Sequence, residues 1–140
     1  MSELRYLLDT NIVSDLMRNP QGPVAQRLAA VGVEHVAIGI VVACELRFGV
    51  ARHSAQRLAE RLELILEHLP VLPLELPVDE HYAGIRDALE RAGTPIGPND
   101  LLIAAQARAL DLVLVTGNLR EFSRVQDLVV ENWLGAPGSE

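Results

Sequence analysis

The stretch LRYLLDTNIVSDLMR, residues 4–18, predicts the first strand and the first helix of the fold. Its first five residues form a short apolar run of the kind that becomes a buried strand. The run ends at Asp9, and the residues that follow have the spacing of an amphipathic helix. Its apolar positions are Ile12, Val13, Leu16 and Met17. The turn residues at 19–22 end the helix, so the stretch is one strand–helix unit with an acidic residue at the junction.

The same alternation continues along the chain. We expect further strands at 36–38, 71–74, 112–115 and 128–130. We expect further helices over 23–31, 41–52, 55–69, 78–92 and 98–110. Short apolar strands that alternate with helices indicate a parallel sheet covered by helices on both faces. We therefore predict an α/β fold, with a single domain over residues 1–134 and a flexible C-terminal tail over 135–140.

Composition excludes several classes of protein. The chain has 140 residues and a net charge of -7, which is the wrong sign for a surface that attracts nucleic acid everywhere. All 12 lysine-or-arginine positions are arginine, which excludes a Walker-type phosphate loop and Schiff-base catalysis because both need lysine. The longest apolar run, 36–44, is too short to span a membrane. With a lone Cys44 and no secretory signal, we expect a cytoplasmic protein that does not bind membranes.

Polar residues that follow the predicted strands are the candidates for a functional site, because ligands of parallel sheets bind at the carboxyl ends of the strands. Asp9 follows the first strand, and Asn118 and Glu121 follow the strand at 112–115. Glu45 lies in the apolar segment VVACELRFG, and Asp100 opens the apolar helix of GTPIGPNDLLIAAQA. A carboxylate in such surroundings is costly to bury unless it is paired or binds a metal.

Each of these residues also has a structural interpretation. Asp9 can be a helix N-cap, and Asp100 can sit in a first turn that Asn99 caps, where the helix dipole favours an anion. Glu45 can lie on the solvent side of its helix, paired with Arg47 or Arg52. The segment from Thr116 to Asn118 can be a turn, with Glu121 a surface charge.

If these carboxylates converge, their mutual repulsion needs a divalent cation. Oxygen ligands without cysteine or a histidine pattern favour Mg²⁺, with Mn²⁺ as a substitute. The four histidines, His35, His53, His68 and His81, lack the spacing of a zinc site. Carboxylate-held Mg²⁺ suits phosphodiester hydrolysis by a metal-activated water.

Four segments carry a resemblance to a known family over essentially the whole chain. They are LLDTNIVSDL, ACELRFGV, GTPIGPNDLLIAAQA, and LVTGNLREFSRV followed by VENW. In this order the chain resembles the PIN-domain ribonucleases, and more closely the VapC toxins of bacterial type II toxin–antitoxin systems. GTPIGPND followed by T-x-N-x-R-E-F is the specific part of the match.

The resemblance implies a small three-layer α/β/α sandwich with a central parallel sheet of about five strands. It implies a Mg²⁺-dependent endoribonuclease in which Asp9, Asp100 and Glu45 are the metal ligands. Asn118 and Glu121 complete the catalytic set. Many relatives have an aspartate where this chain has Asn118, and the closer ones have asparagine.

Three more residues, Thr10, Asn11 and Thr116, are implied to position the carboxylates or the substrate. The resemblance to toxins that carry these segments implies transfer RNA as the substrate. The resemblance also implies a homodimer and a cognate VapB-type antitoxin whose tail covers the site.

An acidic protein needs local attraction for RNA, and Arg47, Arg52, Arg120 and Arg124 are the candidate rim. The alternative is that these arginines only balance nearby glutamates. Two other functions are open. A phosphatase with an aspartyl nucleophile would need an aspartate in place of Asn11 and a lysine that is absent. A non-catalytic module that binds RNA or protein is favoured by Asn118 and opposed by the retained acidic residues.

Overall fold

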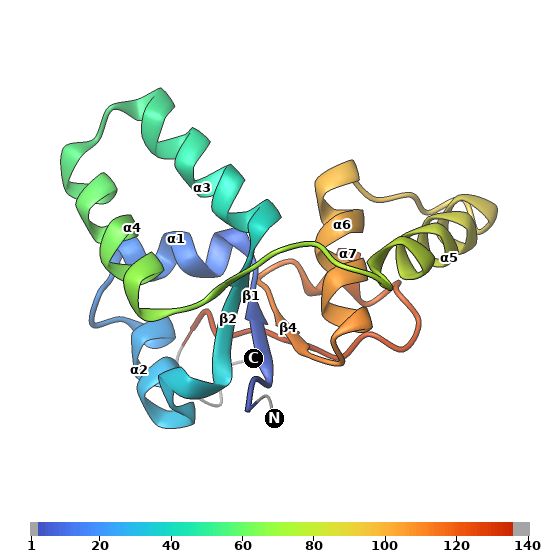
Figure 1. Ribbon diagram of the computed structural model, residues 1–140, viewed down its shortest axis with the longest axis horizontal. Helices are drawn as coiled ribbons and strands as arrows, with labels where there is room; N and C mark the ends of the chain where they lie inside the picture. Colours follow the sequence, from blue (N-terminus) through green and yellow to red (C-terminus); the bar gives the residue numbers. More distant parts are fainter. Residues whose placement is uncertain (1–2, 136–140) are drawn as a thin grey trace.

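A computed structural model describes residues 3–135 and contains a five-stranded parallel sheet (Figure 1). The strands are β1 (Tyr6–Leu8), β2 (Val36–Gly39), β3 (Val71–Leu72), β4 (Val113–Val115) and β5 (Val130–Glu131). They lie in the order β3-β2-β1-β4-β5, and every neighbouring pair is parallel. The predicted parallel sheet of about five strands is confirmed.

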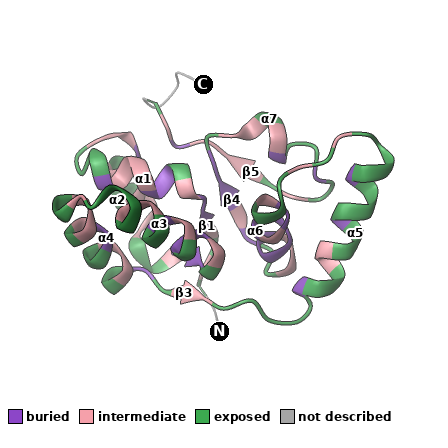
Figure 2. Cartoon of the chain, turned by 90° about the horizontal axis from the view of Figure 1, so that it is seen from above, coloured by how far each residue is buried: buried purple, intermediate pink, exposed green. Residues whose placement is uncertain are grey.

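Helices cover both faces of this sheet. They are α1 (Thr10–Arg18), α2 (Pro23–Val31), α3 (Ile40–His53), α4 (Gln56–His68), α5 (Val78–Arg91), α6 (Pro98–Ala109) and the short α7 (Leu119–Phe122). Figures 1 and 2 place α1 to α4 on one side of the sheet and α5 and α6 on the other. The chain is therefore a three-layer α/β/α sandwich, as predicted. None of the helices among the described residues has the length and apolar run that crossing a bilayer requires.

The central strands are buried on both faces, as Figure 2 shows for β1. Leu7 and Leu8 of β1 and Ile38 of β2 have no exposed surface. Continuous apolar strands of this kind are typical of parallel sheets between two helical layers, and they explain why LRYLL and VAIG are apolar without alternation.

Strand order reverses at β1, and this reversal places the site. The chain runs from β1 to β2 and β3 on one side, and returns to β4 and β5 on the other. Leu8 is in register with Ile38 of β2 and with Val115 of β4. Asp9 and Thr116 therefore leave the sheet at the same edge, at the switch point where ligands of such sheets bind.

A buried glutamine fixes α6, the helix that carries Asp100, against the end of β3. The Gln106 side chain is 1% exposed, and its Nε2 donates to the carbonyl oxygens of Leu72 and Pro73 at 3.1 and 3.2 Å. Gly39 leaves room for this contact, because a Cβ there would lie 2.1 Å from Gln106 Oε1.

The structure differs from the sequence-based expectation in short elements. Residues 33–35 form a 3-10 helix and residues 119–122 form α7, neither of which was predicted. The last strand is Val130–Glu131 rather than 128–130. Elements this short have too few residues for a periodic pattern, and the position of β5 is set by its pairing with β4. Of the predicted tail 135–140, all but Gly135 lies outside the described residues.

Candidate active site

Asp9 joins β1 to α1 and is held at both carboxylate oxygens. Its Oδ1 accepts from the Thr10 backbone N–H at 2.8 Å, and its Oδ2 accepts from Thr116 Oγ1 at 2.8 Å. The side chain therefore caps α1, as its structural interpretation predicted, and also lies at the sheet edge. Asp9 is only 5% exposed, which makes its negative charge costly.

Glu45 reaches the same edge from α3. One carboxylate oxygen accepts from Thr10 Oγ1, and the other accepts from Asn99 Nδ2 at 3.2 Å. The structural alternative, in which Glu45 pairs with Arg47, is not found, because Arg47 Nη1 lies 2.6 Å from Glu63 Oε2 instead. Each oxygen of Glu45 has therefore one neutral donor and keeps a further lone pair.

Asn99 does not cap α6, contrary to expectation. Gly97 holds the N-cap position without a side-chain hydrogen bond, and Pro98 begins the helix. Proline suits that first position because its missing N–H would have no partner there. The Asn99 amide is thereby free to bind Glu45, which links α6 to α3 across the site.

Asp100, in the first turn of α6, meets Glu121 of α7. Burial raises the pKa of Asp100 to about 7, together with a hydrogen bond to the Glu121 carboxyl and repulsion from Glu121, Asp9 and Glu45. Asn118 Nδ2 donates to Glu121 Oε2 at 2.6 Å. The two predicted secondary residues, Asn118 and Glu121, are thus part of one network with Asp100.

Asp9 shares this electrostatic environment. Burial raises the pKa of Asp9 above its ordinary value, opposed by the hydrogen bonds from Thr116 and Thr10 and assisted by repulsion from Glu45 and Glu121. Both pKa shifts have the direction expected for carboxylates gathered without a compensating cation. The convergence of Asp9, Glu45, Asp100 and Glu121 that the strand-end argument predicted is therefore present.

The other predicted residues hold the framework of the site. Thr116 is fully buried; its Oγ1 donates to Asp9 and accepts from the Asn118 backbone N–H at 2.9 Å. Asn11 Oδ1 accepts from the Gly117 N–H at 3.0 Å, which ties α1 to the loop after β4. Thr10 bridges Asp9 and Glu45.

Six of the predicted site residues line a cavity of about 700 Å³. Its lining includes Asp9, Thr10, Asn11, Glu45, Asp100 and Asn118. Sequence reasoning missed the rest of the lining: Ser14, Asp15, Arg18 and Asn19 of the α1 side, and Leu134. The spacing of 11, 14, 15 and 18 was the available signal, because residues three, four and seven apart share one helix face.

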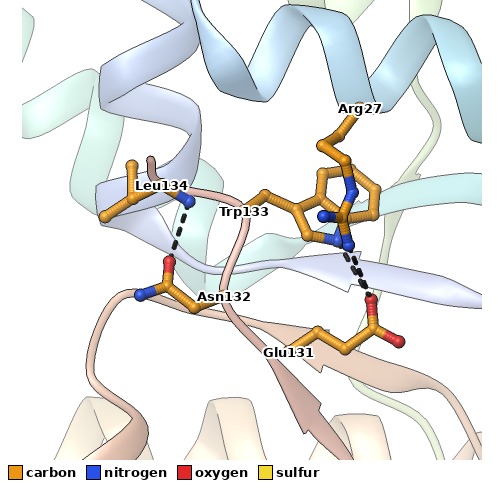
Figure 3. Close-up of polar contacts among 5 residues, drawn as sticks. All are labelled: Arg27, Glu131, Asn132, Trp133 and Leu134. Carbon is orange, nitrogen blue, oxygen red and sulfur yellow. Dashed lines mark hydrogen bonds and ion pairs between the residues drawn. The ribbon is translucent and has the colours of Figure 1, made fainter. Parts of the chain in front are cut away.

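Contacts of the neighbouring Trp133 and Glu131 hold the C-terminal segment, and with it Leu134, in position (Figure 3). Trp133 is buried, its ring 5.1 Å from that of Tyr6, and the Arg27 guanidinium lies 5.7 Å from the Trp133 ring. Glu131 Oε1 accepts from Trp133 Nε1 at 3.1 Å and lies 3.6 Å from Arg27 Nη2.

The loop after β4 depends on glycine where Leu134 arrives. A Cβ at Gly117 would lie 2.6 Å from Leu134 Cδ1, so a larger residue would displace the leucine. The Leu134 N–H is itself held by Asn132 Oδ1 at 2.8 Å. The cavity therefore has one apolar lining residue, Leu134, next to the loop after β4.

The predicted arginine rim is not at the cavity. Arg47 is bound by Glu63, and none of Arg47, Arg52, Arg120 and Arg124 belongs to the lining of this cavity. Arg18 does. The tertiary arrangement, which the local sequence does not reveal, determines which arginine faces the carboxylates.

The donor set fits a hard divalent cation, since it consists of carboxylate oxygens that repel one another. Among residues 3–135, however, no three histidine, cysteine, aspartate or glutamate side chains are arranged as a complete metal-binding group. The oxygen donors therefore suit such an ion, although the described side chains do not form a closed set of ligands.

Comparison with known proteins identifies the family of the chain. The PIN domain model matches residues 6–128. Ribonuclease VapC2 of Rickettsia felis is 34% identical over 130 residues, which cover 91% of this chain and 97% of the relative. The tRNA(fMet)-specific endonuclease VapC of Salmonella typhimurium is 33% identical, with 93% and 98% covered.

Solved structures give the same result. VapBC2 from Rickettsia felis, bound to a DNA fragment from its promoter, matches with a TM-score of 0.84 and 31% identity, covering 93% of this chain and 99% of that chain. VapBC from Salmonella typhimurium, also bound to DNA, matches with a TM-score of 0.81 and 31% identity, covering 93% and 98%. The chain therefore belongs to the PIN-domain family and, within it, to the VapC ribonucleases.

Proposed function

We propose that this ribonuclease is a Mg²⁺-dependent endoribonuclease toxin that hydrolyses phosphodiester bonds of transfer RNA and is inhibited by a VapB-type antitoxin. The observation that carries the proposal is the set of four carboxylates at the switch point, Asp9, Glu45, Asp100 and Glu121. Among residues 3–135 none of these four forms an ion pair with arginine or histidine. Three of the four, Asp9, Glu45 and Asp100, line the open cavity.

Asp9, Asp100 and Glu45 would hold the ion. Bound Mg²⁺ supplies an acidified water and neutralises charge at the phosphate. The hydroxyls of Thr10 and Thr116 and the amide of Asn99 orient Asp9 and Glu45 without neutralising them. Such partners around metal ligands fix ligand orientation and basicity.

Asn118 and Glu121 form the remaining side of the site. The Asn118 amide donates to Glu121. Asparagine at this position therefore orients the neighbouring glutamate and adds no further negative charge. Glu121 in turn contacts Asp100. The attacking water would displace one phosphate ester oxygen in line, with Glu45 as an additional ligand or as the base that takes the proton.

Transfer RNA as the substrate is supported by the names of the Salmonella and Shigella relatives, which are tRNA(fMet)-specific endonucleases. The antitoxin is supported by the structural matches, which are VapBC pairs. We further propose that the chain works as a homodimer in the cytoplasm, as its resemblance to these toxins implies.

RNA cleavage by the purified, antitoxin-free protein tests the proposal. Total transfer RNA is incubated with Mg²⁺, with EDTA, and with the Asp9→Asn and Asp100→Asn variants. Glu63→Gln, a carboxylate removed from the protein surface, is the matched control. We expect discrete fragments from the wild type and control with Mg²⁺ only. Absence of cleavage of any RNA by the folded, Mg²⁺-supplied wild type would contradict the proposal.

The second candidate function is a non-catalytic module that binds RNA or protein. Two observations favour it: the uncharged Asn118, and the lack of a complete metal-binding group in the described part of the chain. A thermal shift separates the two functions, because a ligand that binds only the folded state raises its stability. Millimolar Mg²⁺ or Mn²⁺ should raise the Tm of a nuclease and leave that of a binding module unchanged.

A further inference from the structure

One face of α1 extends the active-site cavity away from the carboxylates. Asn11, Ser14, Asp15 and Arg18 all line the cavity. Asn11 lies next to the Asp9 end, where it binds the loop after β4. Arg18 is seven residues further, which is about 10 Å along a helix. The face therefore runs from the acidic centre to a single cation.

Arg18 is exposed and unengaged. Within residues 3–135 it makes no hydrogen bond or ion pair, and it is the one arginine among the residues lining the cavity. Its neighbour Asp15 forms no ion pair with it: Asp15 Oδ1 accepts from Asn19 Nδ2 at 2.8 Å, and Asp15 Oδ2 is buried without a hydrogen-bond partner. Four other arginines are held by carboxylates: Arg27, Arg47, Arg86 and Arg91.

We infer that Arg18 binds a backbone phosphate of the RNA next to the one being cleaved, and so positions the strand along α1. The inference rests on the proposed function. A guanidinium offers a fork of donors that matches a phosphate. In a chain of net charge -7, with four carboxylates at the centre of the site, a free cation at the cavity edge is the group that can attract the strand.

The length of the α1 face separates Arg18 from the scissile phosphate. The scissile phosphate must lie against Asp9, Asp100 and Glu45, at the other end of the α1 face. Arg18 therefore acts on substrate binding and orientation and is not a catalytic residue. The competing role is purely structural: a cation in the last turn of α1 interacts favourably with the helix dipole. That role predicts a change in stability and none in RNA affinity.

Steady-state cleavage of transfer RNA by three variants separates these roles. Arg18→Gln removes the charge and the donor fork, and Arg18→Lys keeps only the charge. Arg57→Gln is the matched control, because Arg57 is also exposed and without a partner in the described residues but does not line the cavity. KM, kcat and Tm are measured for each, and KM is repeated over a series of salt concentrations.

We expect Arg18→Gln to raise KM about tenfold, the effect of losing one charged hydrogen-bonded contact, with little change in kcat or Tm. The slope of log KM against log salt should fall by about 0.7, the value for one phosphate contact on a single strand. Arg18→Lys should restore the slope and only part of the affinity. Arg57→Gln should match the wild type.

Two failures have different meanings. Wild-type KM and salt slope in Arg18→Gln, or a lowered Tm as its only change, would overturn the inference while cleavage by the wild type keeps the proposed function intact. A folded wild type that neither cleaves nor binds RNA with Mg²⁺ would overturn the proposed function, and this inference with it.

Discussion

The acidic residues on the outer helices and those in the cavity are the same residue types in opposite surroundings. On the outside, Glu63, Glu90 and Asp87 each lie within 2.9 Å of an arginine nitrogen, those of Arg47, Arg86 and Arg91. The hydrogen bond from Arg47 lowers the pKa of Glu63. In the cavity, burial and mutual repulsion raise the pKa values of Asp9 and Asp100.

This difference indicates how the chain separates structural from functional charge. Arginine is plentiful, yet in the described part of the chain it neutralises none of the four central carboxylates. Hydroxyl and amide donors orient them instead. A carboxylate oriented but not neutralised is prepared for a cation from solution, whereas one paired with arginine is not.

The largest expected effect is the difference in kcat/KM between a variant that loses a carboxylate in the cavity and one that loses a carboxylate on the outer helices. Asp100→Asn should lower kcat/KM for transfer RNA by on the order of 10³-fold, because it removes a proposed metal ligand. Glu63→Gln should change kcat/KM less than about twofold, since an exposed ion pair contributes little. Initial rates at saturating Mg²⁺ give the comparison, and similar losses in both variants would break it.

A smaller effect should follow from removing an orienting donor. Thr116→Val deletes the hydroxyl that donates to Asp9 and accepts from the Asn118 N–H. Loss of such a partner typically costs about 10–100-fold in metal affinity or activity. We expect weaker Mn²⁺ binding by calorimetry with a cooperative thermal transition retained. Unchanged Mn²⁺ affinity would show that the hydroxyl only supports the fold.

The metal-free protein should depend on pH in a way set by Asp100. Its pKa is about 7 in the folded state against an ordinary 3.8, so between these values the folded state holds a proton that the unfolded state has released. Stability from this group is therefore lost as pH rises from about 4 to about 7.

Asp100→Asn removes this loss. In EDTA the variant should melt about 3 °C above the wild type at pH 8, after allowance for solvent screening, with a smaller difference at pH 5. Saturating Mg²⁺ should stabilise the wild type alone and so reduce the difference. A variant less stable than the wild type at pH 8 in EDTA would show that repulsion at Asp100 is unimportant.

The smallest effect should be on stability at the surface. Glu63→Gln breaks the Arg47 pair, which is exposed on both sides, and should change Tm by only about 1 °C, less still in high salt. Thermal melts at low and high salt measure this. A large Tm loss would mean that this ion pair stabilises the protein more than an exposed ion pair usually does.

Sequence reasoning located Asp9, Asp100 and Glu45 because parallel strands and a helix start impose a common edge on residues far apart in the chain. It could not find that Asn99 binds Glu45, or that Leu134 forms a wall of the cavity. Those contacts depend on how α6 and the C-terminal segment pack against the rest of the fold. Local sequence patterns do not predict that packing.

Arg18 illustrates the same limit from another side. The sequence marked four arginines by their nearness to acidic motifs, and the structure leaves them outside the cavity lining. The periodicity of α1 contained the better signal. Helix spacing from a residue already assigned to the site predicts further lining residues more reliably than nearness along the chain.

Calorimetric titration with Mg²⁺ at pH 8 tests most directly whether the central carboxylates form a cation site. The wild type and Glu63→Gln should bind Mg²⁺ with the same affinity, and Asp9→Asn and Asp100→Asn should lose that binding while melting cooperatively. No Mg²⁺ binding by the folded wild type, or equal binding by all four proteins, would contradict the assignment of these carboxylates to a metal.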